Sequence, residues 1–120
     1  MDQEDREKIE KIIKDRTESD KKLRDYGSKV YNAFLNMDKQ TYSDGQLKKV
    51  YKELIAIGIS IVINCESCME WHIKEALKSS ASEKQILEAI EVGIEMGGGP
   101  ATVSSRFALK VLEYYRSWLL

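Results

Sequence analysis

Apolar residues recur at the spacing of an α-helix along most of this chain, and that periodicity limits the folds open to it. The clearest series follows Ser43 at i, i+3, i+4, i+7, i+8 and i+11: Leu47, Val50, Tyr51, Leu54, Ile55 and Gly58. A helix gathers such positions on one face, whereas a strand requires strict alternation. Alternating segments are scarce, and Pro100 is the only proline. We therefore predict an all-α fold of about six helices.

The residue pattern in the first half of the chain predicts three helices. Residues 2–25 are dense in charges of both signs and carry few apolar positions, which is typical of a mostly solvated helix. A second apolar stripe begins at Tyr26, and we expect a break over residues 38–42. Ser43 and Gln46 fit a capping box that would open the third helix. We interpret residues 54–63 as the buried end of that helix rather than a strand, because the periodic register runs into it without interruption.

The second half predicts three more helices. Asn64 is a natural N-cap for a helix extending to about residue 77. Ser82 and Gln85 fit another capping box, and the glycines at 97–99 would end the helix that follows. Pro100 suits the first turn of the last helix. Its predicted buried stripe is Phe107, Ala108, Val111, Leu112 and Tyr115, and an apolar end at Trp118, Leu119 and Leu120 indicates burial in an interface.

Length and charge narrow the class of protein. The 120 residues suit one domain over 1–120, with a charged N-terminal helix at 1–25 and a motif-bearing core at 43–117. Lys and Arg total 19 against 20 Asp and Glu, which argues against a nucleic-acid or anionic-membrane partner. The longest apolar run, 54–63, is half of the roughly 20 residues that span a bilayer. With no signal-peptide pattern at the start, we expect a cytoplasmic protein.

Both cysteines and the only histidine fall within eight residues, as Cys65, Cys68 and His72. On a helix they lie at i, i+3 and i+7 and project from one face. A helix N-terminus and a neighbouring imidazole favour the reactive thiolate form of cysteine. His72, four residues after Cys68, could reach its sulfur, and Cys65 could close a disulfide onto Cys68. The pattern therefore favours thiol redox chemistry.

Two other interpretations of this cluster stay open. The thiols could be inert core residues, since cysteine is among the most buried residue types. They could also bind a metal, although zinc needs three or four ligands and the chain offers no further Cys or His. A thioredoxin-like site is disfavoured because no βαβ unit is visible.

The full pattern is Glu53-x11-Cys65-x-x-Cys68-x3-His72, followed by the glycine turn and Pro100 before the last helix. It resembles the alkylhydroperoxidase D-like branch of the carboxymuconolactone decarboxylase family over about residues 45 to 115. The resemblance implies an all-α fold that assembles into homotrimers or homohexamers, and a thiol peroxidase needing no cofactor or metal. It departs from the better-known peroxidases at Ser67, where those members have a histidine.

The resemblance also implies a role for each matching residue. Cys68 would attack the hydroperoxide, and His72 with Glu53 would relay its proton. Cys65 would resolve the product to a disulfide that an external dithiol reductant reopens. By sequence alone Glu53 is a helix residue four after Lys49, and an exposed ion pair is the commoner explanation. If buried, it should have a raised pKa suited to proton transfer.

Two other functions remain as hypotheses. The family name points to decarboxylation of a lactone acid, a reaction that does not use paired thiols. A non-enzymatic oligomer could instead use Cys65 and Cys68 to sense oxidation or to bind a metal. Counting thiols before and after peroxide treatment, and analysing bound metal, would separate these classes.

Overall fold

Six α-helices make up the regular structure of the described residues. The computed structural model describes the backbone of residues 1–119 and the side chains of residues 1–116. The helices are α1 (Gln3–Asp25), α2 (Lys29–Thr41), α3 (Lys49–Val62), α4 (Glu66–Lys78), α5 (Glu83–Gly97) and α6 (Gly99–Leu119). The all-α prediction is therefore confirmed. The predicted interface side chains of Trp118, Leu119 and Leu120 lie outside the described side chains.

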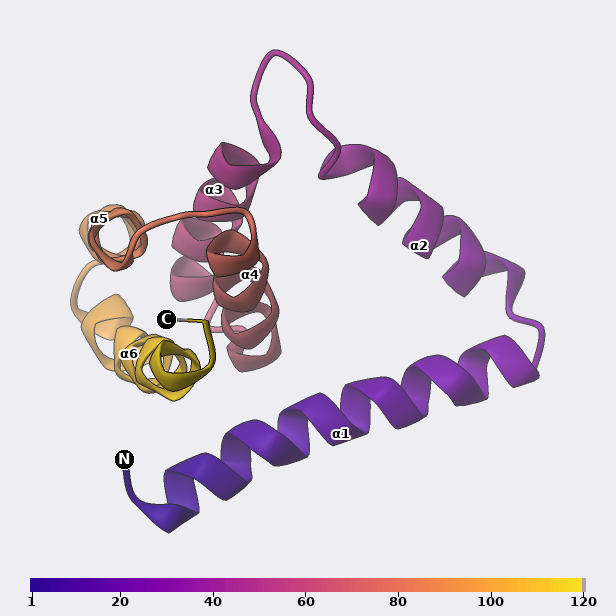
Figure 1. Cartoon of the computed structure of the whole chain (residues 1–120), viewed down its shortest axis with the longest axis horizontal. Coiled ribbons are helices and arrows are strands. Elements are labelled where there is room, and N and C mark those ends of the chain that lie inside the picture. The colour runs from indigo at the N-terminus through magenta and orange to yellow at the C-terminus, as the bar shows by residue number, and fades with distance from the viewer. Residues whose placement is uncertain (120) are drawn as a thin grey trace.

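Helices α3 to α6 form the body of the molecule (Figure 1). Helix α3 packs most extensively against α5 and α4, and α6 closes on α4 and α5. Burial of an aliphatic side chain stabilises the fold by about 1.5–3 kcal/mol. Fully buried aliphatic side chains from all four helices form one core, which also joins α3 and α4, the two helices that carry the predicted site: Ile57, Ile61, Met69, Ile73, Ile86 and Val111.

Glycines allow α3 and α5 to approach closely. A Cβ atom at Gly93 would lie 2.7 Å from the carbonyl oxygen of Gly58 and 2.8 Å from the Cβ of Ile61. No side chain fits there, so the helical pattern that places both glycines on inward faces has a packing reason. The same two helices also line an open apolar groove of about 650 Å³. Its walls include Ile55, Ile59 and Met96.

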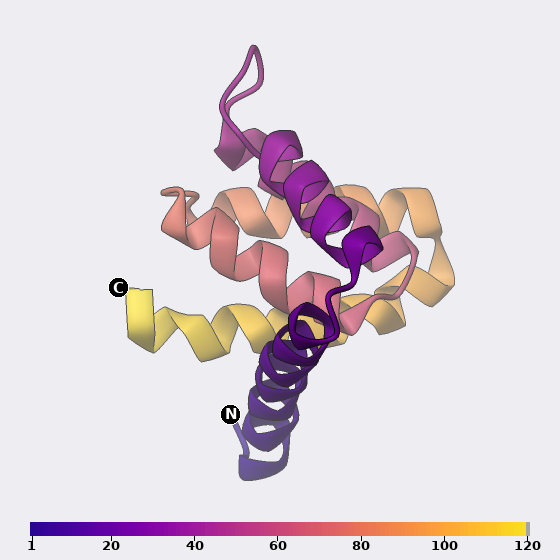
Figure 2. The same cartoon turned by 90° about the vertical axis from the view of Figure 1, so that its right-hand side faces the viewer.

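Helix α1 lies across the body, while α2 stands away from it (Figures 1 and 2). The fully buried Ile9 anchors α1, which contacts α4 and α6. Among the described helices, α2 packs only on α1. The periodic stripe predicted from Tyr26 onward is therefore helical yet exposed, with Val30 at 83% and Met37 at 57% of their full accessible surface. None of the described helices is both long and apolar enough to cross a membrane.

Three predicted helix boundaries are wrong. Helix α2 continues through Thr41, so it covers most of the predicted break at 38–42, and the chain leaves the helix at Tyr42. Ser43 does not cap α3, because its hydroxyl donates to the carbonyl of Gln40; Asp44 Oδ1 instead accepts from the backbone N–H of Lys49. Asn64 is not the N-cap of α4 either, since its φ is +53° and the next residue, Cys65, holds that place.

Other local predictions are confirmed. Ser82 and Gln85 form the expected capping box at the start of α5. Gly98 follows α5 with a φ of +72°, a conformation that glycine adopts without the usual steric cost. The end of α3 is helical as predicted, but only one of its faces is buried. Ile57 and Ile61 face the core, whereas Ile59 and Val62 face solvent.

Candidate functional site

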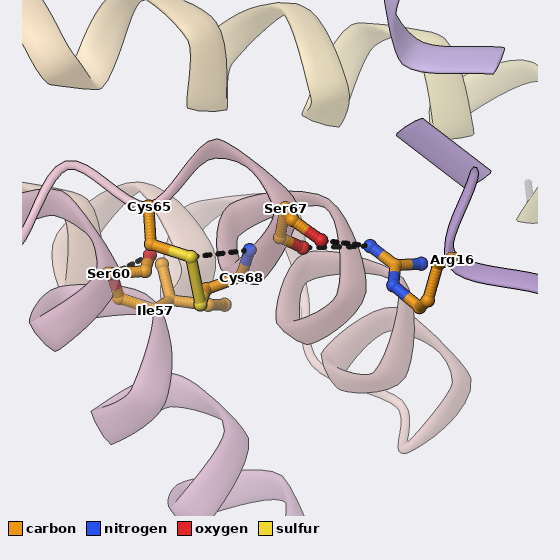
Figure 3. The surroundings of a disulfide bond; sticks show 6 residues. All are labelled: Arg16, Ile57, Ser60, Cys65, Ser67 and Cys68. Carbon is orange, nitrogen blue, oxygen red and sulfur yellow. Dashed lines mark hydrogen bonds between the residues drawn. A yellow bond between two sulfur atoms is a disulfide. The ribbon is translucent and has the colours of Figure 1, made fainter. Parts of the chain in front are cut away.

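The two cysteines lie at the N-terminus of α4 and are joined by a disulfide (Figure 3). Cys65 is the N-cap residue, and its Sγ accepts a hydrogen bond of 3.1 Å from the backbone N–H of Cys68. The N–H of Cys65 donates to the carbonyl of Ser60 at the end of α3. Both cysteines are partly exposed. The pair is therefore held by backbone contacts from two helices and remains open to solvent.

His72 lies one helical turn after Cys68 and contacts Glu53 of α3. Its Nδ1 is 2.7 Å from Glu53 Oε1, and Lys49 Nζ donates to Glu53 Oε2 at 2.6 Å. An ionised carboxylate can only accept, so Nδ1 carries the proton and Nε2 is left as an acceptor. The structure thus pairs His72 with Glu53 across the α3–α4 contact and joins Cys65 to Cys68 at the start of α4, one helical turn before His72.

Glu53 has a lower pKa than predicted. Burial, which leaves 1% of its surface exposed, acts to raise the pKa, but the hydrogen bonds from His72 and Lys49 outweigh it and hold the pKa below its ordinary value. The expected raised pKa is therefore wrong, because two donors stabilise the charged form. Glu53 stays ionised at neutral pH, so it orients the imidazole, and His72 is the group able to accept a proton.

Tyr42 covers the imidazole and was not singled out from the sequence. Its ring centroid is 5.1 Å from that of His72, and Lys49 Nζ lies 5.8 Å from the Tyr42 ring. Burial raises the pKa of Tyr42, which keeps its phenol protonated. Burial likewise raises the pKa of Asp38, on the last turn of α2. Tyr42 lies in a connection between helices, where periodicity carries no information about contacts.

A second buried carboxylate, Glu70, was also missed. It has no exposed surface and accepts hydrogen bonds from the Arg16 guanidinium and the Tyr115 hydroxyl. A signal for it was present, since Glu70 falls beside Met69 and three residues before Ile73 on the inward face of α4. A carboxylate on an apolar stripe must be paired. Among the described residues, no group of three or more His, Cys, Asp or Glu side chains is arranged to hold a metal ion.

The fold and the site define a class: an all-α protein with a disulfide-forming Cys-x-x-Cys pair at a helix N-terminus, beside a carboxylate-bound histidine. Residues 28–111 match the model of the carboxymuconolactone decarboxylase family. The chain belongs to that family, and its fold is alkylhydroperoxidase D-like.

Individual relatives agree with this assignment. A protein of the cox locus of Paracoccus denitrificans is 40% identical over 87 residues, covering 72% of this chain and 78% of the relative. A family member from Legionella pneumophila superposes with a TM-score of 0.85 at 30% identity, covering 90% and 96% of the two chains. One from Thermotoga maritima, for which a part in an antioxidative response has been suggested, superposes with a TM-score of 0.81 at 29% identity, covering 89% and 91%.

Proposed function

We propose that this protein is a cytoplasmic thiol peroxidase that reduces hydroperoxides with the Cys65–Cys68 pair. The observation that carries the proposal is the position of that disulfide one helical turn from His72, which is itself bound to the buried Glu53. Family membership and the antioxidative role suggested for the Thermotoga maritima relative add support. Lactone decarboxylation finds no comparable support, because it gives the paired thiols no task.

The proposed reaction balances in three steps. The Cys68 thiol transfers its proton to His72 Nε2, and the thiolate attacks the terminal oxygen of ROOH. The O–O bond breaks, and the imidazolium returns the proton to the leaving alkoxide, giving a sulfenic acid and ROH. The Cys65 thiol then displaces water from that sulfenic acid and forms the disulfide. An external dithiol reduces the disulfide and is itself oxidised. The net change is ROOH plus a dithiol giving ROH, water and a disulfide.

The polar groups around His72 suit this chemistry. Glu53 holds Nδ1–H, so the basic Nε2 is free for the thiol proton, and its negative charge stabilises the imidazolium that forms. Lys49 compensates the buried carboxylate at 2.6 Å. Tyr42 shields one side of the ring from water. Cys68 lies in the first turn of α4, where the helix dipole favours a thiolate.

Steady-state consumption of cumene hydroperoxide with dithiothreitol as electron donor tests the proposal. Wild-type protein should turn over many equivalents, and the Cys68→Ser variant should turn over none. Cys65→Ser should form a sulfenic acid on Cys68, detectable by a dimedone adduct, without forming the intramolecular disulfide. Oxidation of two thiols per chain without turnover would instead indicate a redox sensor. Survival of both thiols in equimolar peroxide would contradict the proposal, and the reverse pattern in the two variants would show that the roles are exchanged.

We further propose that the protein assembles into a homotrimer or homohexamer. The apolar stripe of α2, with Phe34 half exposed, and the groove along α3 and α5 are unfilled apolar surfaces of one chain. Sedimentation analysis should give a multiple of the 13.8 kDa chain mass. Phe34→Glu should shift the mass towards the monomer, whereas Asn32→Glu, on the opposite side of α2, should not. A monomeric wild-type protein at micromolar concentration would contradict the proposal.

A further inference from the structure

One side chain of α1 reaches the segment between the two cysteines. Arg16 Nη2 donates to both the backbone carbonyl oxygen and the Oγ of Ser67, each at 2.9 Å (Figure 3). Its other terminal nitrogen, Nη1, donates to Glu70 Oε1 at 2.5 Å. Three quarters of the Arg16 side chain is buried. One guanidinium therefore binds the residue directly before Cys68 and the first buried turn of α4 at the same time.

The charges around this guanidinium do not cancel. Among the described side chains, Glu70 is the carboxylate in direct contact with Arg16. Arg16 and Lys74 are two cations, the latter with Nζ 3.7 Å from Glu70 Oε2. The Trp71 ring lies between the two cations, with its centroid 5.3 Å from Arg16 Cζ and 4.6 Å from Lys74 Nζ. Glu70 and Trp71 thus hold Arg16 in place without neutralising the whole group. Among Arg16, Glu70 and Lys74 one positive charge is therefore left over, while Glu66, in the N-terminal turn that carries Cys68, is paired with Lys8.

We propose that Arg16 is a positioning residue for the redox pair: it fixes the Ser67 backbone and stabilises the thiolate that Cys68 forms when the disulfide is reduced. The guanidinium donates two parallel hydrogen bonds to Ser67, and its planar fork makes that geometry rigid. Positive charge and the helix N-terminus favour the charged form of the thiol. The family-matched segment begins at residue 28, so Arg16 belongs to the part of the chain that the family model does not include.

Stabilising the thiolate has a consequence for the disulfide equilibrium. A thiolate exists only in the reduced protein, so every group that stabilises it favours reduction and makes the pair a stronger oxidant. Removing Arg16 should therefore make the Cys65–Cys68 disulfide harder to reduce. The inference rests on the proposed redox activity of the pair, but it does not depend on a peroxide as substrate.

The test measures the pH dependence of Cys68 alkylation by iodoacetamide, in a Cys65→Ser background so that one thiol reacts. Arg16→Ala should move the midpoint of the rate profile upward by about one pH unit and lower the rate at pH 7 about five- to tenfold. Arg16→Lys should recover most of the shift because it keeps the charge. The matched control is Arg24→Ala, which removes another arginine of α1 whose ion pair, with Asp20, is exposed.

The other ionisable groups facing the pair are unchanged by these substitutions. Among the described residues they are Lys49, Glu53 and His72, with Tyr42 and Asp38 beside them, Lys74 on α4, and the Lys8–Glu66 ion pair near the start of α4. The imidazole of His72 can itself exchange a proton with the thiol, so the comparison is repeated with His72→Gln in every protein. The shift caused by Arg16→Ala should persist there. A shift that disappears with His72 would overturn the inference, because Arg16 would then act only through the imidazole.

Equilibration of the two-cysteine proteins with glutathione buffers gives the second readout. Arg16→Ala should change the thiol–disulfide equilibrium constant about tenfold towards the disulfide, which corresponds to about 30 mV. Equal midpoints and equal equilibrium constants in Arg16→Ala and Arg24→Ala would overturn the inference. If Arg16→Ala fails to fold, Arg16→Gln replaces it, because glutamine is neutral but keeps a hydrogen-bond donor. The same shift of the midpoint and the same change in the equilibrium constant are expected. If the wild-type protein does not turn over peroxide, but Arg16→Ala still shifts the alkylation midpoint and the equilibrium constant, only the proposed peroxidase function is rejected.

Discussion

Replacing Glu53 by glutamine should weaken the fold and slow the redox site together. The carboxylate is 1% exposed and accepts from His72 at 2.7 Å and from Lys49 at 2.6 Å. Glutamine has nearly the same shape, but it offers one acceptor oxygen and turns an NH₂ group towards a second donor. One of the two existing donors must therefore lose its partner.

The magnitude follows from the two contacts. A hydrogen bond to a charged group contributes about 1.5–3 kcal/mol, and removing one partner of a buried ion pair costs about 3–5 kcal/mol. Lys49 is 34% exposed and keeps Glu75 at 3.4 Å, so its share of the loss is reduced by solvent and by that second carboxylate. We expect Glu53→Gln to lower the free energy of unfolding by about 2–4 kcal/mol.

Urea unfolding of the oxidised protein measures this without any redox chemistry, through the transition midpoint at constant slope. The matched control is Glu75→Gln, which removes the more distant carboxylate of Lys49. The pH dependence gives a further check. Because the folded-state pKa of Glu53 is lowered, its stabilising contribution is present above the ordinary carboxyl range and is lost as pH falls through the folded-state pKa. The difference between wild type and Glu53→Gln should therefore shrink on acidification below about pH 4.

The same variant should reduce hydroperoxide about 10- to 100-fold more slowly at pH 7, since His72 loses both its orientation and the charge that stabilises its protonated form. The deficit should narrow above about pH 9, where the thiol ionises without a base. A stability loss under about 0.5 kcal/mol, or an equal loss in Glu75→Gln, would refute the assignment of Glu53 as the buried anchor of the site.

Three further predictions concern packing, capping and the second buried carboxylate, each measured by urea unfolding. Gly93→Ala should cost about 1–3 kcal/mol because the new methyl meets the α3 backbone, whereas Gly45→Ala should cost little, because its methyl would lie at an ordinary contact distance of 3.8 Å from Lys52 Nζ. Ser82→Ala should cost about 1 kcal/mol by removing a helix cap, and Ser43→Ala should cost less than half of that because Ser43 caps no helix. Tyr115→Phe should cost about 1–3 kcal/mol, since the fully buried Glu70 loses a donor.

The helical fold could be predicted because its signal is repeated at every turn. Each helix of the body buries several apolar residues at helical spacing, so one ambiguous position does not change the result. The predicted stripe of the last helix is buried at all five positions, from Phe107 to Tyr115. Helix ends are different, because each depends on only one or two hydrogen bonds. Asp44 competes with Ser43 for the cap of α3, and only the path of the connection decides between them.

The composition of the site could be anticipated, but its electrostatics could not. Spacing alone places Cys65, Cys68 and His72 on one side of α4, and the family pattern adds Glu53. The pKa of Glu53 depends instead on which donors face it after α3 packs on α4, and the sequence pattern does not fix the distance to His72. Arg16 is harder still to find, because its partners, Ser67 and Glu70, lie more than fifty positions away along the chain.

The arrangement of α4 explains why both polar networks bear on the same thiols. At 100° per residue, the positions of Cys68 and His72 fall on one side of the helix, and those of Ser67, Glu70 and Lys74 fall on nearly the opposite side. The buried apolar residues between the two sides set how closely α4 approaches α3 and α6, but apolar contacts tolerate small rotations about the helix axis. Hydrogen bonds tolerate such rotations poorly, because their strength falls steeply with angle. Helix α4 is held by hydrogen bonds from α3 on one side and from α1 on the other. Rotation of α4 sets the direction of the Cys68 side chain, so the two networks together determine where the reactive sulfur points.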